Sequence, residues 1–394
     1  MHQARRAQKI LDLANARAEE QLQFVIELSH QNSYSWNKAG TDAVAEMVLA
    51  RLGDVLASHQ VVEQTQVGNL HLLTNAFSGQ KSIYVLAHMD TVFPPDHPFK
   101  ECRIEEDRLH GPGTGDMKAG VAAAVYALLI LGELNLLDEI PVTLILAGDE
   151  EVGAFTSRAV YEEELKKALA CLVVEGGGLN GEVVLSRYGK IGARLESRGR
   201  DAHVGDRKLR KASAILELSH KVMGLEGLNG VVPGARINVG TIEGGLGPAT
   251  VPARASAQVD IRWPEQDDRD TLVGNIREVV AARDLEGCSS ELVILNERPA
   301  WAWSENTQTL AEVVKAAGAE LGQEIGEEHR MGTSDSNFFG AAGVPTLDGL
   351  GPVCKGYHTS EEFVYISSIC ERTALLANAM VKMGARLSGK DEIG

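Results

Sequence analysis

Short, uninterrupted runs of apolar residues alternate with a helical pattern in the first half of the chain. The apolar runs cover residues 82–87, 142–147 and 170–174, and the stretch 117–134 has the length and pattern of a helix. Apolar strands without a polar face, separated by helices, are typical of a parallel sheet that is covered on both sides. The pattern therefore predicts an α/β domain with a mostly parallel central sheet.

A different pattern begins near Gly189. Apolar and polar positions alternate over residues 190–200, which predicts a strand with one buried face. The elements predicted after it are a helix, two strands, a helix and a strand, at 208–223, 235–243, 255–263, 268–282 and 291–295. This order is that of a ferredoxin-like (β-α-β-β-α-β) domain, whose antiparallel sheet can leave an edge free to pair with a second copy.

The α/β pattern resumes after Trp301. It predicts one strand at 345–347 and three helices, at 304–321, 335–342 and 366–387. A chain of 394 residues is long enough for two domains. We therefore predict a larger catalytic domain made of residues 1–188 and 300–394, into which a smaller domain of residues 189–299 is inserted.

The composition narrows the possible partners. A formal net charge of −17 disfavours nucleic acid, whose phosphates would be repelled, whereas clustered carboxylates would attract divalent cations. Five scattered cysteines without a Cys-x-x-Cys pair fit a reducing compartment. The N-terminus mixes both charge signs, and the longest apolar run, 121–131, is too short to span a bilayer. We expect a cytoplasmic protein that binds neither nucleic acid nor a membrane.

Polar groups follow each of the three apolar runs. They are, run by run, His88 and Asp90, then Asp149, Glu150 and Glu151, then Glu175. Because the carboxyl ends of parallel strands meet at one edge of a sheet, we expect these side chains to lie close together. Imidazole and carboxylate groups are zinc ligands, and a cation would relieve the repulsion between clustered carboxylates. The sequence therefore predicts a metal site at this edge.

The spacing within these groups suggests separate roles. A carboxylate two residues after a ligating histidine can accept the second ring N–H, which would be the role of Asp90 toward His88. Since Glu150 and Glu151 are neighbours, one can bind metal while the other takes a proton from water. Each group alone has an ordinary structural explanation, but their common position favours a metal-dependent active site.

The run GPGTGDMKAG at residues 111–120 has two interpretations. Glycines ahead of a lysine resemble a phosphate-binding loop, but a Walker loop needs Lys-Ser or Lys-Thr directly after its last glycine, and here Asp116 follows Gly115. This disfavours nucleotide binding. We interpret the glycines as allowing a tight bend that aims Asp116 at the sheet edge, and we expect Lys118 on the helix surface or behind the ligands.

Five motifs occur together in order along the chain. They are HMDTV from His88, GPGTGDMKAG from Gly111, DEEVG from Asp149, GTSD from Gly332, and DGLGP from Asp348 followed by GYH ending at His358. The set resembles the zinc hydrolase superfamily of bacterial glutamate carboxypeptidase (carboxypeptidase G), acetylornithine deacetylase, succinyl-diaminopimelate desuccinylase, aminoacylase and cytosolic tripeptidase. The resemblance covers essentially the whole chain. It implies a zinc-exopeptidase-like catalytic domain with an inserted dimerisation and lid domain.

The resemblance also implies a metal set. Two zinc ions would bind per subunit, with Co²⁺ or Mn²⁺ as possible substitutes. One ion would be held by His88 and Glu175, the other by Glu151 and His358, and Asp116 would bridge both.

Catalytic roles are implied in the same way. Glu150 would be the general base and later the acid toward the leaving amine, while Asp90 would orient His88. The peptide between Asp116 and Met117 is often cis in this family. His203 of the inserted domain matches a histidine that reaches the active site of the partner subunit in a homodimer and stabilises the oxyanion.

The substrate is less closely defined. Arg262 and Arg298 match positions that hold a substrate carboxylate, for which the bidentate guanidinium is suited, although each could be an ordinary paired arginine. Glu175, where other branches have aspartate, resembles the carboxypeptidase and deacylase branches. Ala249 departs from the family, which often has asparagine three residues before Pro252.

These residues predict a zinc-dependent hydrolase of a small peptide or N-acyl amino acid. We expect a glutamate-type carboxypeptidase, which releases a C-terminal amino acid. An N-acyl-amino-acid deacylase, acting on acetyl or succinyl groups, is the main alternative, because both reactions release an amine that carries a free carboxylate. An inactive relative that only binds metal or peptide is a remote alternative, since none of the expected groups is missing.

Overall fold

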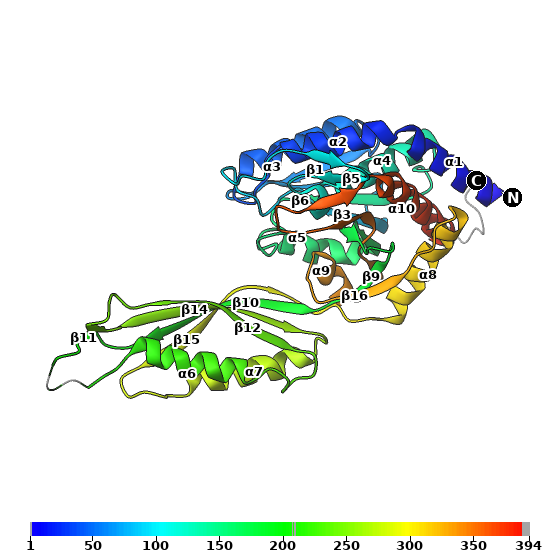
Figure 1. The fold of residues 1–394 in the computed structure, drawn as a ribbon. Helices are drawn as coiled ribbons and strands as arrows, with labels where there is room; N and C mark the ends of the chain where they lie inside the picture. The colour runs from blue at the N-terminus through cyan, green and yellow to red at the C-terminus, as the bar shows by residue number, and fades with distance from the viewer. Residues whose placement is uncertain (1, 207, 209, 388–394) are drawn as a thin grey trace. The chain divides into compact units, whose positions relative to one another are not determined.

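The computed structural model describes residues 2–206, 208 and 210–387 (Figure 1). The chain forms two compact units. The first contains the residues up to Ser186, Trp303–Arg330 and those from Ser334 onward, and the second contains Arg187–Ala302 and Met331–Thr333. That residues 189–299 form a separate inserted domain stays a prediction.

A six-stranded sheet lies at the centre of the first unit, with the strand order β1-β2-β6-β3-β7-β17. In that order the strands span Ser58–Val62, Leu70–Thr74, Val142–Ala147, Ser82–His88, Ala168–Val173 and Thr346–Leu347. The strands from β6 to β17 are parallel, whereas β1 and β2 pair in antiparallel fashion. The predicted α/β architecture is confirmed, and β1 and β2 are additions that the sequence pattern did not reveal.

Helices cover both faces of this sheet. They are α1 His2–Ala16, α2 Ala18–His30, α3 Lys38–Leu52, α4 Ala119–Glu133, α5 Ser157–Glu164, α8 Glu305–Glu320, α9 Ser336–Ala341 and α10 Ile366–Leu387. In β3, Val85 belongs to the larger core with α1–α4, α8 and α10, whereas Tyr84 and Leu86 belong to a smaller core with α5 and α9. Burial on both faces explains why residues 83–87 of the strand show no alternation of apolar and charged positions.

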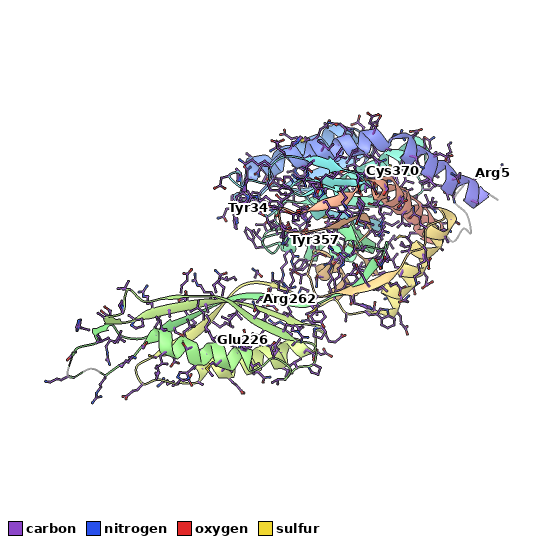
Figure 2. All side chains as sticks on the ribbon, in the orientation of Figure 1. Arg5, Tyr34, Glu226, Arg262, Tyr357 and Cys370 are labelled. Atoms are coloured by element: carbon purple, nitrogen blue, oxygen red, sulfur yellow. The ribbon has the colours of Figure 1, made fainter. Side chains whose placement is uncertain are left out.

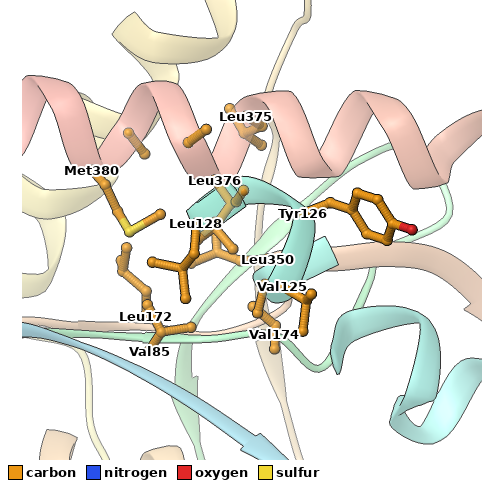
Figure 3. Close-up of a cluster of buried hydrophobic side chains, with 14 of the residues drawn as sticks. Val85, Val125, Tyr126, Leu128, Leu172, Val174, Leu350, Leu375, Leu376 and Met380 are labelled. Atoms are coloured by element: carbon orange, nitrogen blue, oxygen red, sulfur yellow. The ribbon is translucent and has the colours of Figure 1, made fainter. Parts of the chain in front are cut away.

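The larger core is shown in Figure 3. Val85 of β3 and Leu172 of β7 lie in one cluster with Leu128 of α4 and with Leu376 and Met380 of α10. The C-terminal helix thus packs on the same side of the sheet as α4, and it closes the core of the first unit.

Helix α4 packs tightly against the end of β7. A Cβ atom on Gly120 would lie 1.9 Å from the main-chain oxygen of Val174, so glycine is required for this approach. The helical segment Thr114–Glu133 is long and apolar enough to cross a membrane, but 83% of its apolar window is buried inside the protein. Burial in the core accounts for its composition.

A second sheet of the first unit brings the segment that contains His358 close to the central sheet. Its order is β4-β5-β19-β18-β8, with bounds Arg103–Glu105, Arg108–His110, Phe363–Tyr365, Gly351–Lys355 and Gly176–Gly177. Strand β8 directly follows Glu175, and it pairs in parallel with β18. His358 lies in the connection from β18 to β19, so this pairing carries it toward the carboxyl end of β7. A small sheet of β9 (Val183–Arg187) and β16 (Glu327–Arg330) completes the strands of this part.

The second unit contains a four-stranded antiparallel sheet of order β12-β14-β10-β15. The bounds are β10 Gly189–Arg198, α6 Ala214–Glu226, β12 Arg236–Gly244, β14 Arg254–Trp263, α7 Asp268–Ala281 and β15 Ser289–Arg298, with short strands β11 Ala202–His203 and β13 Thr250–Val251 pairing separately. The helices and the sheet share a core that includes Leu195, Leu218, Ile261 and Trp263. The predicted ferredoxin-like order is confirmed.

Two predicted boundaries in this unit were wrong. The helix expected over 208–223 begins at Ala214, because the side chain of Ser213 accepts a hydrogen bond from the amide of Leu216 and caps the helix there. Residues 207 and 209 lie outside the described residues. The strand expected at 291–295 extends over Ser289–Arg298, because its pairing with β10 continues beyond the apolar run.

His71 of β2 is a buried imidazole that resists protonation. Its Nδ1 lies 3.0 Å from Nε2 of His59 on β1, and the two rings stack with centroids 5.2 Å apart. Its Nε2 is buried and has no hydrogen-bond partner among the described residues. Burial, and then the neighbouring His59, lower the pKa of His71 to about 4; the charge of Lys38 acts in the same direction and that of Asp42 opposes it.

The first prediction concerns stability and pH. Between pH 6.5 and about 4 the unfolded chain binds a proton at His71 that the folded chain excludes, so stability is lost as the pH falls through this window. The free energy of unfolding is measured by urea denaturation with a chelator present, at a pH of about 7.5 and again at about 5. Between these pH values it should fall by roughly 1–2 kcal/mol less in the His71→Gln variant than in the wild type. The exposed His220→Gln should behave as the wild type. Equal losses in all three proteins would contradict the assignment.

Candidate metal centre

His88 is the last residue of β3, and its ring is held in place from behind. The side chain is 2% exposed, and its Nδ1 lies 3.0 Å from the main-chain oxygen of Asp90 and 3.4 Å from Asp90 Oδ1. This leaves Nε2 facing Asp116, with a distance of 3.1 Å to Oδ1. Asp90 is therefore placed to orient His88, with its main-chain oxygen as the nearer acceptor.

The carboxylate of Asp90 joins three segments of the chain. It accepts hydrogen bonds from Ser35 Oγ at 2.6 Å and from the amides of Glu150 and Glu151 at 3.2 Å each. The ends of β3 and β6 and the loop between α2 and α3 are thereby fixed to one another. Ser35 was not predicted, because nothing in its local sequence marks a serine that acts 55 residues away.

Asp116 lies on a tight loop ahead of α4. Gly113 has a φ of 72°, which favours glycine, and the Asp116–Met117 peptide is cis, as the resemblance implies. The amides of Gly115 and Asp116 donate to the same oxygen, Oε1 of Glu362, at 2.8 and 3.0 Å. Glu362 is fully buried, and it was missed in the sequence although it lies four residues after His358.

Lys118 is buried, so of the two positions expected for it, on the helix surface or behind the ligands, the structure has the second. Its Nζ donates to the main-chain oxygens of Leu28 and Gln31 at 2.7 and 2.8 Å. These oxygens are at the C-terminal end of α2, where a lysine satisfies carbonyl groups that the helix leaves unpaired. Lys118 thus anchors the loop of Asp116 to α2 from behind.

The predicted ligands form two groups that share Asp116. Asp116 Oδ1 lies 3.1 Å from His88 Nε2, and Asp116 Oδ2 lies 3.1 Å from His358 Nε2. Glu175 Oε1 is 3.6 Å from His88 Nε2, whereas Glu151 Oε2 is 3.1 Å from His358 Nε2. Five side chains from five separate parts of the chain therefore converge on one small volume.

Protonation is strongly perturbed in this cluster. Burial raises the pKa of Glu175 well above its usual range and, together with the charge of Asp116, raises the pKa of Glu151 to about 8. Burial would raise the pKa of Asp116 and lower that of His88, but their contacts with each other and with neighbouring groups reverse both shifts. Hydrogen bonds to Asp116 and Glu151 raise the pKa of His358 to about 11. Protons thus offset the crowding of carboxylates in the metal-free protein, and a bound cation would displace them.

The donor atoms fit a divalent cation. One ligand atom from each of His88, Asp116 and Glu151 lies within 4.8 Å of the others. Glu151 Oε1 is buried, yet it has no hydrogen-bond partner among the described residues. A cation would satisfy this oxygen, and imidazole nitrogen with carboxylate oxygen is a donor set that suits zinc.

Three predicted site residues lie in the second unit. His203 is exposed on β11. Arg262, labelled in Figure 2, donates through Nε to Asp260 Oδ1 at 2.7 Å and through Nη1 to the main-chain oxygen of Met331 at 2.8 Å. Arg298 is only 5% exposed. The roles of these residues toward a substrate stay predictions.

Arg330 in the first unit is a cation that the sequence analysis missed. Its Nη1 donates at 2.9 Å to the main-chain oxygen of Gly176, the residue after Glu175. Its position two residues before the motif at Gly332 is the signal that could have revealed it.

A sheet edge with clustered histidine and carboxylate side chains, and a glutamate beside them, defines a metallohydrolase. Comparison with known proteins gives the family: residues 84–382 match the family described as peptidase family M20/M25/M40. The chain belongs to this family, whose members depend on a metal, typically zinc.

The similar proteins include both a carboxypeptidase and a desuccinylase. The chain is 28% identical over 314 residues to carboxypeptidase G2 of Pseudomonas sp. strain RS-16, covering 78% of this chain and 75% of that protein. It is 29% identical over 346 residues to succinyl-diaminopimelate desuccinylase of Acidiphilium cryptum, covering 83% and 90%. A tripeptidase from Staphylococcus aureus shares the fold, with a TM-score of 0.78 at 20% identity over 94% of this chain and 99% of that one.

The second prediction concerns the carboxylate behind the loop. Glu362→Ala removes the acceptor of two amide groups that fix Asp116, so zinc affinity should fall by roughly 10–100-fold in competition with a chelator. Glu362→Gln keeps one oxygen acceptor and should lose less. The exposed neighbour Glu361→Ala should bind zinc as the wild type does. Unchanged affinity in Glu362→Ala would show that the loop holds its position without this contact.

Proposed function

We propose that the protein is a zinc-dependent carboxypeptidase of the glutamate type, which hydrolyses an amide bond and releases a C-terminal amino acid. The observation that carries this proposal is a carboxylate, Asp116, shared between two histidine–glutamate pairs, with Glu150 beside them. Similarity to carboxypeptidase G2 over 78% of the chain supports the choice of substrate class.

The five clustered side chains would hold two zinc ions. His88 and Glu175 would hold one, His358 and Glu151 the other, and Asp116 both. When bound, the ions would polarise the amide carbonyl group and lower the pKa of the attacking water.

Glu150 is the carboxylate that remains for proton transfer. Its amide is fixed by Asp90, and the next residue, Glu151, faces His358 instead. Glu150 would take a proton from the attacking water and deliver it to the nitrogen of the leaving amine. His203 of a partner subunit would stabilise the negative charge that develops on the carbonyl oxygen.

The third prediction tests Glu150. Glu150→Ala should bind as much zinc per chain as the wild type, because the five ligands are intact, while kcat falls by about 10²–10⁴-fold. Zinc content by mass spectrometry and turnover are measured on the same samples, with the exposed Glu163→Ala as the matched control. Wild-type turnover in Glu150→Ala would remove the assignment of the general base.

An N-acyl-amino-acid deacylase is the second candidate function. The similarity to a succinyl-diaminopimelate desuccinylase over 83% of the chain favours it, and the same metal chemistry serves both reactions. A screen with identified products separates them: zinc-loaded protein is incubated with folyl-glutamate, with benzoyl-, acetyl- and succinyl-amino acids and with dipeptides. Preference for a large acyl group on a C-terminal glutamate supports the carboxypeptidase, and exclusive cleavage of small acyl groups supports the deacylase.

A homodimer formed through the second unit is part of the proposal. Strand β12 is at an edge of its sheet, and exposed apolar side chains lie on it and on the helix α6 that packs beside it. They include Ile242 at 58% exposure, Met223 at 74% and Leu216 at 40%. An open edge flanked by apolar side chains is suited to pairing with the same edge of a second copy.

The fourth prediction tests whether His203 acts in the partner's site. Glu150→Ala and His203→Ala should each be nearly inactive, but a mixed dimer then contains one complete site. After subunit exchange, an equal mixture should regain about one quarter of the wild-type activity, since half of the dimers are mixed and each has one working site.

The same experiment contains a control for the interface. Adding Ile242→Lys to both variants should prevent the recovery, whereas Ile294→Lys on the opposite edge strand β15 should not. If the mixture of Glu150→Ala and His203→Ala, without a lysine substitution, regains no activity, His203 acts within its own chain or has no catalytic role.

A further inference from the structure

Two half-exposed aromatic rings stack on one another, and the loops that carry them are hydrogen-bonded to Asp90 of the candidate metal centre. Trp36, in the loop between α2 and α3, is 50% exposed, and Phe155, in the loop after β6, is 47% exposed. Their ring centroids are 5.9 Å apart and their planes differ by 28°. We call this stacked and half-exposed pair of rings the aromatic shelf.

Both loops are attached to one carboxylate oxygen of the site. Asp90 Oδ2 accepts from Ser35 Oγ at 2.6 Å and from the amide of Glu151 at 3.2 Å. Trp36 directly follows Ser35, so its Cα lies about 3.8 Å from the Cα of Ser35. Phe155 is four residues beyond Glu151. The aromatic shelf is therefore carried by the same two loops that hold the Asp90 carboxylate and contain the proposed base.

The backbone that carries each ring is fixed. The amide of Ser35 donates to the main-chain oxygen of Thr91 at 3.2 Å. On the other side, the buried carboxylate of Asp149 accepts from the amides of Thr156 and Ser157 at 2.7 and 3.1 Å, immediately after Phe155. The loops would therefore lose little conformational entropy when a ligand stacks on these rings.

The charges nearby favour an uncharged ligand group. Lys38 and Arg158, the basic residues closest in sequence to the two rings, are already paired: Lys38 Nζ lies 2.8 Å from Asp42 Oδ2, and Arg158 Nε lies 2.8 Å from Glu162 Oε1. The amino-acid side of the substrate carries a carboxylate that needs a free cation. The acyl side carries none, and it is the side that an apolar surface can accept.

We infer that the aromatic shelf binds a planar aromatic acyl group of the substrate and makes the enzyme selective for N-aroyl amino acids over N-acetyl amino acids. This inference rests on the proposed function. Trp36 and Phe155 are specificity residues here and take no part in the chemical step. Offset stacking of a third ring on an ordered aromatic pair contributes about tenfold to affinity.

The test compares two substrates that differ only in the acyl group, N-benzoyl- and N-acetyl-glutamate. In Trp36→Ala and Phe155→Ala, kcat/KM for the benzoyl substrate should fall about tenfold, mainly through KM, and kcat/KM for the acetyl substrate should change less than about twofold. Trp36→Phe should keep most of the selectivity. Phe77→Ala, at an exposed aromatic residue 81% accessible between β2 and β3, is the matched control and should change neither substrate.

The outcomes separate this inference from the proposed function. Equal losses of kcat/KM on both substrates would contradict the inference, because the rings would then act only in holding the loops. A change of oligomeric state in the variants would also contradict it, because the rings would then bind another chain. Cleavage of neither substrate by the wild type would contradict the proposed function and leave the binding measurement below to decide on the shelf.

Binding is measured without turnover in the Glu150→Ala background. N-(4-nitrobenzoyl)glutamate should quench tryptophan fluorescence on contact with Trp36, and the quenching at saturation should be lost when Trp36→Phe is added. Quenching of equal size in both proteins would show that the aryl group lies elsewhere.

Discussion

Asp116 contacts His88 through one carboxylate oxygen and, through the other, His358, which lies 242 residues further along the chain. The two histidines are brought there by different sheets, the central one through β3 and the second one through the connection from β18 to β19. Glu175 and Glu151 flank the pair on either side. Without a cation the repulsion between the three carboxylates is offset by protons shared with the histidines, so the geometry favours metal binding.

The surrounding structure serves to hold this one carboxylate. Glu362 fixes the loop of Asp116 from the side of the C-terminal sheet, and Lys118 fixes it to the end of α2. Gly120 lets α4 approach β7 closely enough to bring the loop over the carboxyl ends of the strands. Asp90 likewise holds His88, Glu150 and Glu151 in position. Chemistry and packing are thus coupled, because the residues that position the ligands are also the residues that join the core elements.

Much of this arrangement could be predicted from the sequence, for a physical reason. Strands buried on both faces are apolar throughout, so β3, β6 and β7 were found together with the side chains at their ends. His358 was found only through the family resemblance, because it follows β18 in a different sheet and no apolar pattern links it to β3. Ser35 and Glu362 were missed since they act through hydrogen bonds between distant segments. The partners of Lys118 were not predicted, because a lysine gives no local sign that carbonyl groups of another helix will accept its hydrogen bonds.

Anomalous diffraction at the zinc absorption edge, on crystals of the zinc-loaded protein, tests the central claim most directly. The account predicts two zinc peaks per chain, one between His88 and Glu175 and one between His358 and Glu151, both within bonding distance of Asp116. A single peak, or zinc bound away from Asp116, would contradict it.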